Sequence, residues 1–212
     1  MRLALISDTH GMLPEDIPDC DAIIHAGDIG PDRNTHQWWD ETFRPWAVKA
    51  GVPIYATFGN HDFAWPPLSL TPGNLQLVVD APVDILGLKV YFTPWVQNLP
   101  RWAWNLPDSG AAQKCYAAIP DDIDILVSHA PPSGYGDCLK ESALKYGLER
   151  NTRVGSPELA ARLESFEDIF VICGHIHEDR GRFIAQHNIV YNVSSVDGDY
   201  IPYPNRWTML EF

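Results

Sequence analysis

The first eleven residues, MRLALISDTHG (1–11), place a short apolar run directly before an aspartate and a histidine. The run LALIS (3–7) has the length and composition of one buried strand, and Asp8 and His10 follow it. One arginine and a short apolar stretch are also typical of a signal peptide, but no small-residue cleavage site follows them. We therefore expect a first β-strand whose carboxyl end carries Asp8 and His10.

Four further apolar runs repeat this arrangement along the chain. Each is short, rich in Ile, Val, Leu or aromatic residues, and bounded by Gly, Pro or Asp, as expected of buried strands. Residue types that commonly bind metals follow each run: Asp28 after AIIHAG (22–27), Asn60 and His61 after IYATFG (54–59), His129 after DILVS (124–128), and His175 and His177 after FVICG (170–174). The sequence thus predicts five strands that each end in a candidate ligand.

Segments with a helical pattern separate some of these runs, at 34–50, 109–118 and 157–165. The first is expected to break or kink at Pro45. The last has a clear start, because Ser156 is a typical N-cap and Pro157 suits the first helical position. Strands that alternate with helices indicate an α/β fold.

Other segments look like strands that follow one another without a helix between them. They lie in the middle of the chain, where LQLVV, VDILG and LKVYF occur (75–92), and near its end, at 182–195 and 206–212. They predict a second, more antiparallel sheet. No repeat, low-complexity tract or linker interrupts the sequence, so residues 1–212 are expected to form one domain.

Candidate ligands at five strand ends predict a metal centre. In an open α/β sheet the loops at the carboxyl ends of the strands converge on one edge, where ligands bind. Carboxylate, imidazole and amide groups without a thiolate suit Mn, Fe, Zn or Mg. Seven ligands are too many for one ion, so we expect two divalent ions bridged by the carboxylate of Asp28. The predicted ligands are Asp8, His10, Asp28, Asn60, His129, His175 and His177.

The composition restricts the class of partner. The chain has 28 acidic and 15 basic residues, and its formal net charge of −13 repels the backbone of long nucleic acids. A small phosphorylated substrate held by metals tolerates this charge. No apolar run reaches the roughly 18 residues that a membrane span needs. The four cysteines form no CxxC pair, so we expect reduced thiols and a cytoplasmic location.

Five short motifs mark the predicted strand ends: ISDTHG (6–11), IIHAGD (23–28), GNHD (59–62), DILVSHAPP (124–132) and GHIHE (174–178). Their order, spacing and strand context resemble the signature of the calcineurin-like metallophosphoesterases, over nearly the whole chain. With TPW (93–95) and NLP (105–107), the resemblance narrows to the small metallophosphoesterase-domain (239-type) group of class III cyclic-nucleotide phosphodiesterases. The family implies two stacked mixed β-sheets flanked by helices, a four-layer α/β/β/α sandwich.

The resemblance also implies roles for individual residues. His61 would protonate the leaving oxygen or stabilise the charge that builds on phosphorus. A hydroxide that bridges the two metals, Mn being the favoured ion, would attack a small phosphodiester, with cyclic nucleotides as the expected class. Asn60 would help to hold the phosphoryl oxygens. The implied ligands are Asp8, His10, Asp28 and His177 for one metal, and Asp28, Asn60, His129 and His175 for the other.

Alternative functions use the same residues. A phosphomonoesterase, such as a protein phosphatase, could act at this site, and a non-catalytic metal-binding scaffold is a second alternative. Scaffolds tend to lose ligands, whereas this set is complete. A nuclease is disfavoured by the acidic charge. The physiological substrate, the metal bound in the cell and the oligomeric state do not follow from the sequence.

A tryptophan-rich segment is the candidate for a wall that holds a base. TPWVQNLPRWAWNLP (93–107) contains Trp95, Trp102 and Trp104 beside Arg101. Aromatic faces stack on bases, so Trp95 and Trp104 are predicted to bind substrate. The alternative is that these tryptophans only pack a Pro-rich loop onto the core.

Three further positions have two interpretations each. His25 is expected to be a hydrogen-bonded core histidine rather than a support for the metal ligands. Asp62 either orients His61 or caps the turn that follows it. Gly155 and Ser156 either offer N–H groups to a phosphate or form an ordinary helix cap, the interpretation that we prefer.

Overall fold

A computed structural model describes residues 1–32, 36–63, 66 and 71–212. The first sheet has the strand order β15–β1–β2–β3–β4, with β1 to β4 parallel and β15 antiparallel to β1. The first three apolar runs of the sequence therefore lie side by side. The strands are β1 (Arg2–Ile6), β2 (Ala22–His25), β3 (Ile54–Ala56), β4 (Leu75–Leu77) and β15 (Thr208–Glu211).

The second sheet has the order β13–β14–β12–β9–β6–β5. Its central strands β14, β12, β9 and β6 run parallel, and the edge strands β13 and β5 are antiparallel to their neighbours. The strands are β5 (Ala81–Ile85), β6 (Leu88–Thr93), β9 (Ile125–Ser128), β12 (Phe170–Cys173), β13 (Gly181–Ala185) and β14 (Asn188–Asn192).

This second sheet is less antiparallel than the sequence predicts. The chain passes through a helix between β6 and β9 and through another between β9 and β12, and such crossovers produce parallel neighbours. The strand-like segments near the C-terminus also divide between the sheets. β13 and β14 join the second sheet as a hairpin, whereas β15 lies beside β1 in the first.

Helical segments cover the outer face of the first sheet. Trp39 and Phe43 pack with Ile23 of β2 in one buried cluster. Pro45 directly follows a π-helical stretch, at the start of the next α-helix. The chain stays helical there, since Phe43 and Arg44 both keep helical φ and ψ angles, and only the hydrogen-bonding pattern changes. Residues 34 and 35 of the predicted helix 34–50 lie outside the described residues. The segments are α1 (His36–Trp38), a π-helical stretch (Trp39–Phe43) and α2 (Arg44–Ala50).

Two helices, α3 (Ser109–Ala117) and α4 (Pro157–Leu163), cover the outer face of the second sheet. Tyr116 of α3 and Leu163 of α4 pack in one cluster with Val171 of β12. Ser156 caps α4 as predicted, since its hydroxyl oxygen accepts a hydrogen bond from the Leu159 N–H at 3.1 Å.

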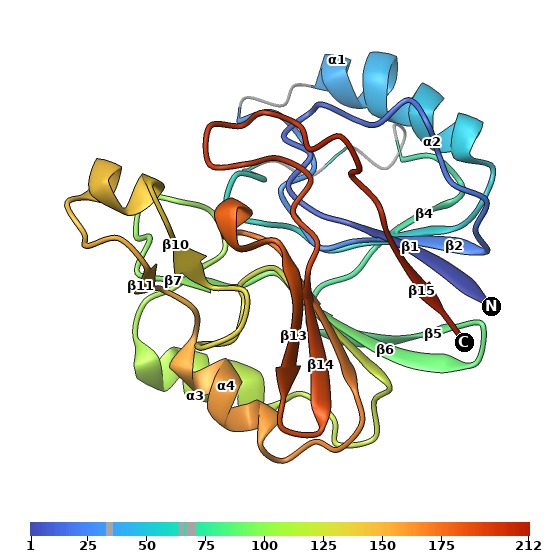
Figure 1. The fold of residues 1–212 in the computed structure, drawn as a ribbon. Helices are drawn as coiled ribbons and strands as arrows, with labels where there is room; N and C mark the ends of the chain where they lie inside the picture. Colours follow the sequence, from blue (N-terminus) through green and yellow to red (C-terminus); the bar gives the residue numbers. More distant parts are fainter. Residues whose placement is uncertain (33–35, 64–65, 67–70) are drawn as a thin grey trace.

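A third cluster lies between the two sheets and joins them. Leu3 and Leu5 of β1 pack there with Val90 and Phe92 of β6 and Val127 of β9. The layers are therefore helix, sheet, sheet and helix (Figure 1), which confirms the predicted α/β/β/α sandwich. No helix of the described residues is long and apolar enough to cross a membrane.

Short elements lie outside these layers, beside the strand ends (Figure 1). We use the name cap segment for residues 138–154, which contain β10 (Cys138–Leu139), a 3-10 turn (Ser142–Tyr146) and β11 (Thr152–Arg153). β10 and β11 pair antiparallel. The other short elements are β7 (Val96–Gln97), β8 (Asn105–Leu106) and the 3-10 turn η4 (His177–Asp179).

Candidate metal centre

The backbone bends sharply where the strands end. Asp8, His10, Asp28 and His175 all have positive φ angles, between 44° and 68°. A positive φ is uncommon for residues other than glycine and costs free energy, so it persists only where the surrounding structure imposes it. Four of the seven predicted ligands thus share a strained conformation at the same edge of the sheets.

Glycines allow these side chains to approach the backbone closely. A Cβ on Gly59 would lie 2.2 Å from Asp28 Oδ1, and a Cβ on Gly174 would lie 2.2 Å from Asp8 Oδ2. A Cβ on Gly27 would lie 2.6 Å from His129 Nδ1. Each glycine before a predicted ligand therefore leaves room for another ligand's side chain, in addition to any role in turning the chain.

One group of predicted ligands comes from β1 and from the turn after β12. His177 Nε2 lies 3.4 Å from Asp8 Oδ1 and 3.2 Å from His10 Nε2. The Nδ1 of His177 donates to the Asp197 carbonyl oxygen at 3.2 Å, so Nε2 is the nitrogen left to bind a metal. The Nδ1 of His10 has no hydrogen-bond partner in the described part of the chain. Two imidazole nitrogens facing a carboxylate in this way fit a divalent cation.

The second group surrounds Asp28. His129 Nε2 lies 3.4 Å from Asp28 Oδ2 and 3.2 Å from Asn60 Oδ1, and His129 Nδ1 donates to the Ala26 carbonyl oxygen at 2.9 Å. The His175 ring is edge-on to the His129 ring, with 5.1 Å between their centroids. Asp28 Oδ2 also lies 3.8 Å from His10 Nε2, so its carboxylate stands between the two groups. This position fits a bridging ligand.

Burial and charge set the protonation of these side chains. Burial lowers the pKa of His10 to about 4 and the pKa of His175 to about 3, so both imidazoles are neutral and can donate a lone pair. Burial also opposes protonation of His129, but the charge and hydrogen bond of Asp28, the charge of Asp8 and the Ala26 carbonyl together outweigh it and raise the pKa of His129 to about 9. Burial likewise disfavours the charge on Asp28, yet the His129 cation holds its pKa well below the usual range. A metal that binds between them replaces that proton.

His61 lies beside both groups but has a different partner. Its backbone N–H donates to Asp28 Oδ1 at 2.8 Å, and its ring centroid is 4.7 Å from that of His10. Its Nδ1 makes a short contact with Asp32 Oδ1, which leaves Nε2 as the other nitrogen able to carry a proton. Asp32 was not predicted from the sequence. Its place four residues after Asp28, in the same loop, was the available signal.

Asp62 does not orient His61. Its carboxylate accepts hydrogen bonds from the N–H groups of Gly59 at 2.9 Å, Ile29 at 3.1 Å and Gly30 at 3.2 Å. It therefore caps the turn after β3 and ties it to the turn after β2. Burial, with a smaller contribution from Asp28, raises the pKa of Asp62 to about 7.

A cavity of about 560 Å³ opens at this edge of the sheets. Asp28, Asn60 and His61 line it together with Trp102 and Tyr200. The Trp102 ring lies 4.3 Å from the His61 ring, between centroids. The cavity thus combines predicted ligands with aromatic side chains that were not predicted to bind substrate.

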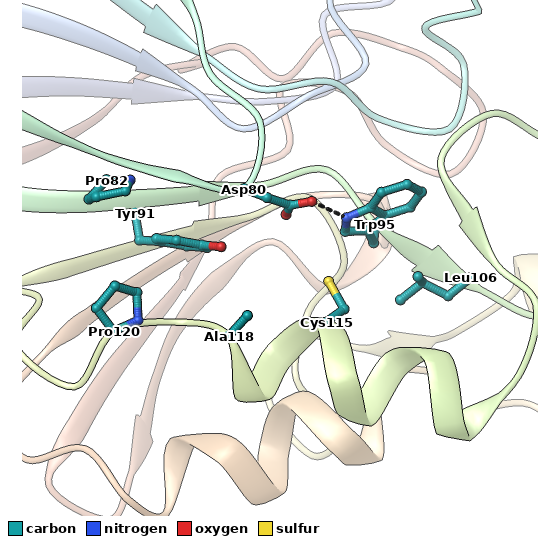
Figure 2. Close-up of a pocket in the computed structure, with 8 residues that line it drawn as sticks. All are labelled: Asp80, Pro82, Tyr91, Trp95, Leu106, Cys115, Ala118 and Pro120. Atoms are coloured by element: carbon teal, nitrogen blue, oxygen red, sulfur yellow. Dashed lines mark hydrogen bonds between the residues drawn. The ribbon is translucent and has the colours of Figure 1, made fainter.

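Trp95 and Trp104, which the sequence predicts to bind substrate, are not among the residues that line this cavity. Trp95 faces a separate pocket of about 390 Å³, lined by Tyr91 and Cys115 among others, and its Nε1 donates to Asp80 Oδ2 at 2.8 Å (Figure 2). Trp104 stacks on Phe58 at 5.1 Å between ring centroids. Both residues are half-buried, and their rings meet edge to face at 5.5 Å between centroids.

The two remaining positions follow the simpler interpretation. His25 is buried, and its Nε2 lies 3.0 Å from the Thr9 hydroxyl oxygen, as expected of a hydrogen-bonded core histidine. The N–H of Gly155 donates to Asp137 Oδ2 at 3.1 Å and is not available to a phosphate. Gly155 and Ser156 are thus part of the helix cap.

Comparison with known proteins agrees with this geometry. The family model described as Calcineurin-like phosphoesterase matches residues 1–179. The chain belongs to the calcineurin-like phosphoesterases. The match includes every predicted ligand from Asp8 to His177. These proteins are generally hydrolases that use divalent metals to act on phosphoesters, so this phosphoesterase is a metal-dependent enzyme with candidate ligand groups at the strand ends.

Individual relatives of this phosphoesterase are distant. It is 26% identical over 235 residues to Metallophosphoesterase domain-containing protein 1 of Homo sapiens, covering 95% of this chain and 68% of the relative. It is 27% identical over 204 residues to a UPF0046 protein of Caenorhabditis elegans, covering 85% of this chain and 65% of that protein. A crystal structure of a Thermus thermophilus protein superimposes with a TM-score of 0.60 at 15% identity, over 91% and 88% of the two chains, and shows the shared fold.

Proposed function

We propose that this phosphoesterase hydrolyses small phosphodiesters, with cyclic nucleotides as the favoured class, at two metal ions held in one domain. The observation that carries the proposal is the cavity in which Asp28, Asn60 and His61 meet Trp102. A phosphoryl group needs the metal ligands, and a base needs an exposed aromatic face. Both are present on the wall of a single cavity.

The seven predicted ligands divide into two sets, one for each proposed ion, according to the distances between their side chains. We assign Asp28 to both ions, and we favour Mn because the donors are carboxylate, imidazole and amide groups. When bound, the two ions supply an activated water and neutralise charge on the phosphoryl oxygens. The chain's own side chains orient the ester. We assign Asp8, His10 and His177 to one ion, and Asn60, His129 and His175 to the other.

His61 is proposed to protonate the leaving oxygen. Its Nδ1 is occupied by Asp32, so Nε2 is the atom that would deliver the proton. Asp32 would fix the orientation and tautomer of the ring and stabilise its protonated form. Through this contact Asp32 acts as a positioning residue for His61.

Trp102 takes the role of base stacking that the sequence had given to Trp95 and Trp104. Its side chain is 37% exposed, lines the cavity and lies against His61. A base bound on this ring would be the one attached to the leaving oxygen, because His61 is adjacent. Phe63 is 55% exposed and lies 6.0 Å from Trp102 between ring centroids, which extends the aromatic surface.

The net charge and the cysteines of the chain bear on its partners and its location. The net charge of −13 favours a small substrate over a long nucleic acid, as it did on the sequence alone. We propose a cytoplasmic location because free thiols persist under reducing conditions. The free cysteines are Cys20, Cys115, Cys138 and Cys173.

A Mn-supplemented activity screen tests the proposal. It should compare bis-p-nitrophenyl phosphate, p-nitrophenyl phosphate, and 2′,3′- and 3′,5′-cyclic nucleotides. We expect diesters to be cleaved faster than the monoester and at least one cyclic nucleotide to be hydrolysed. Cleavage of the monoester alone would favour a phosphatase, and cleavage of no substrate by a metal-loaded protein would favour a scaffold.

A further inference from the structure

The cap segment (138–154) forms one wall of the metal cavity. It contributes apolar and aromatic side chains there, in contrast to the polar floor made by the predicted ligands. Tyr146 is 69% exposed, and Leu148 and Val154 are also exposed although they line the cavity. The residues of the segment that line the cavity are Leu139, Ser142, Tyr146, Leu148, Arg153 and Val154.

A single carboxylate next to a predicted metal ligand fastens the first part of this wall. Glu178 follows His177 directly in η4. Its Oε2 accepts the Lys140 N–H at 2.7 Å, its Oε1 accepts the Ser142 N–H at 3.1 Å, and the Ser142 hydroxyl donates to the same carboxylate. Hydrogen bonds to a charged group are about twice as strong as neutral ones. The cap backbone is thus held by the residue after the ligand.

Neighbouring residues leave little room for the Glu178 side chain to adopt another conformation. A Cβ on Gly198 would lie 2.7 Å from Glu178 Cγ, so the carboxylate side chain is packed against the loop that carries Tyr200. The neighbouring Asp179 accepts the Cys138 N–H at 3.0 Å, and Lys140 Nζ donates to the Glu178 carbonyl oxygen at 2.6 Å. The start of the cap segment is therefore attached to η4 at several atoms.

The end of the cap segment has a separate attachment. Asp137 is fully buried, and its Oδ1 accepts from Arg153 Nη1 at 2.6 Å while its Oδ2 accepts the Gly134 and Gly155 N–H groups at 3.0 and 3.1 Å. Loss of Glu178 would therefore release the stretch around residues 140–146 without detaching the base of the segment.

We propose that Glu178 is a positioning residue that fixes the cap wall relative to His177, so that the wall selects a ring-bearing group on the substrate. The proposal rests on the proposed phosphodiesterase function. His61 and Trp102 form the side of the cavity that receives the leaving group. In a diester with two separate ester groups, the cap wall then holds the group that stays on phosphorus. Its Leu and Tyr side chains favour an aromatic or nucleoside group over a methyl group.

Three diesters with one leaving group separate this role from the chemistry. Methyl p-nitrophenyl phosphate, bis-p-nitrophenyl phosphate and the p-nitrophenyl ester of thymidine 5′-phosphate all release p-nitrophenolate but retain groups of different size. In Glu178→Ala we expect KM to rise about tenfold for the two ring-bearing diesters, with KM for the methyl ester and kcat for all three within about twofold. Glu178→Gln, which keeps one acceptor oxygen, should lie between Glu178→Ala and the parent.

Glu141→Ala is the matched control, because Glu141 is an exposed carboxylate of the same segment that pairs with Arg150. It should leave all three KM values unchanged. An equal rise of KM for all three diesters in Glu178→Ala would overturn the proposal, since it would indicate damage to the metal centre. A parent enzyme that cleaves none of the three would overturn the proposed function and the assignment of the wall with it.

Amide hydrogen exchange tests the anchoring without activity. The amides of Lys140 and Ser142 should exchange at least about tenfold faster in Glu178→Ala than in the parent, with β9 and β12 unaffected. Metal content should be equal in both proteins. Unchanged exchange at Lys140 and Ser142 would contradict the anchoring role, whatever the kinetics show.

Discussion

The metal centre and the cap segment form the same cavity in different ways. Predicted ligands stand at the ends of central strands of both sheets, where the backbone is strained and the glycines before them leave no space for a Cβ. The cap segment consists of two-residue strands and a 3-10 turn, held mainly through the carboxylates of Asp137 and Glu178. Because the ligands stand on strands of the sheets, the position of the reaction is fixed by the fold. The cap segment consists of loops and short elements, so its side chains can change, and with them the substrate specificity, while the fold stays the same.

The largest effect should come from the ligand shared by both halves of the centre. Asp28→Ala removes the carboxylate between His10 and His129, so we expect loss of bound metal and a fall in kcat/KM of at least about 10⁴-fold. Asn60→Ala, which removes a ligand of one proposed ion, should lose less. Metal content measured by atomic absorption checks both variants. Equal metal in Asp28→Ala and the parent would contradict the bridging role.

His61 should matter for chemistry and not for metal binding. We expect His61→Ala to retain both metals and to lose about 10² to 10⁴-fold in activity on substrates with a poor leaving group, the usual range for general acid catalysis. The loss should shrink for p-nitrophenyl esters, whose leaving group needs no proton. If Asp32 acts through His61, the Asp32→Asn/His61→Ala double variant should be no worse than His61→Ala. A uniform loss across leaving groups would favour electrostatic stabilisation instead.

Metal affinity should depend on pH through His129. Because Asp28 raises the pKa of His129 to about 9 in the metal-free protein, a metal must displace a proton at lower pH. The apparent Mn affinity should therefore fall about tenfold for each pH unit as the pH drops from about 8 to about 6. Calorimetric titration in buffers of different ionisation enthalpy would count the released protons. An affinity that does not vary over this range would contradict the assignment of His129 as a ligand.

The smallest effect belongs to the aromatic wall. Trp102→Ala should raise KM for a cyclic nucleotide about tenfold, since base stacking is worth about 1–3 kcal/mol. Trp95→Ala is the control, because Trp95 lines the other pocket and should leave KM unchanged. Equal effects of the two substitutions would argue against stacking at Trp102.

The sequence predicted the strand ends that carry the candidate ligands because the signal for them is local. An apolar run followed by a ligand marks a strand end whether or not the sheet order is known, and β1, β2, β3, β9 and β12 all end as expected. The helix caps also follow from local chemistry, as Ser156 shows. The family resemblance implied two mixed sheets. It did not indicate that β13 and β14 join the second sheet while β15 joins the first.

The cavity walls could not be predicted because they depend on which way each loop side chain points. Trp95 and Trp104 were chosen from a motif, yet Trp95 lines a separate pocket and Trp104 stacks on Phe58. Trp102 is the tryptophan of this segment that lies beside His61. Asp62 was considered as the partner of His61 because it is adjacent in sequence. The contact is made by Asp32, which reaches His61 from the preceding loop.

A crystal soaked in Mn and measured at the Mn absorption edge tests the two-metal centre most directly. We predict two anomalous peaks about 3.5–4 Å apart, one on each side of the Asp28 carboxylate, with His10 and His177 near one peak and His129 and Asn60 near the other. A map with no peak near Asp28, from an enzyme that is fully active in excess chelator, would contradict the metal centre.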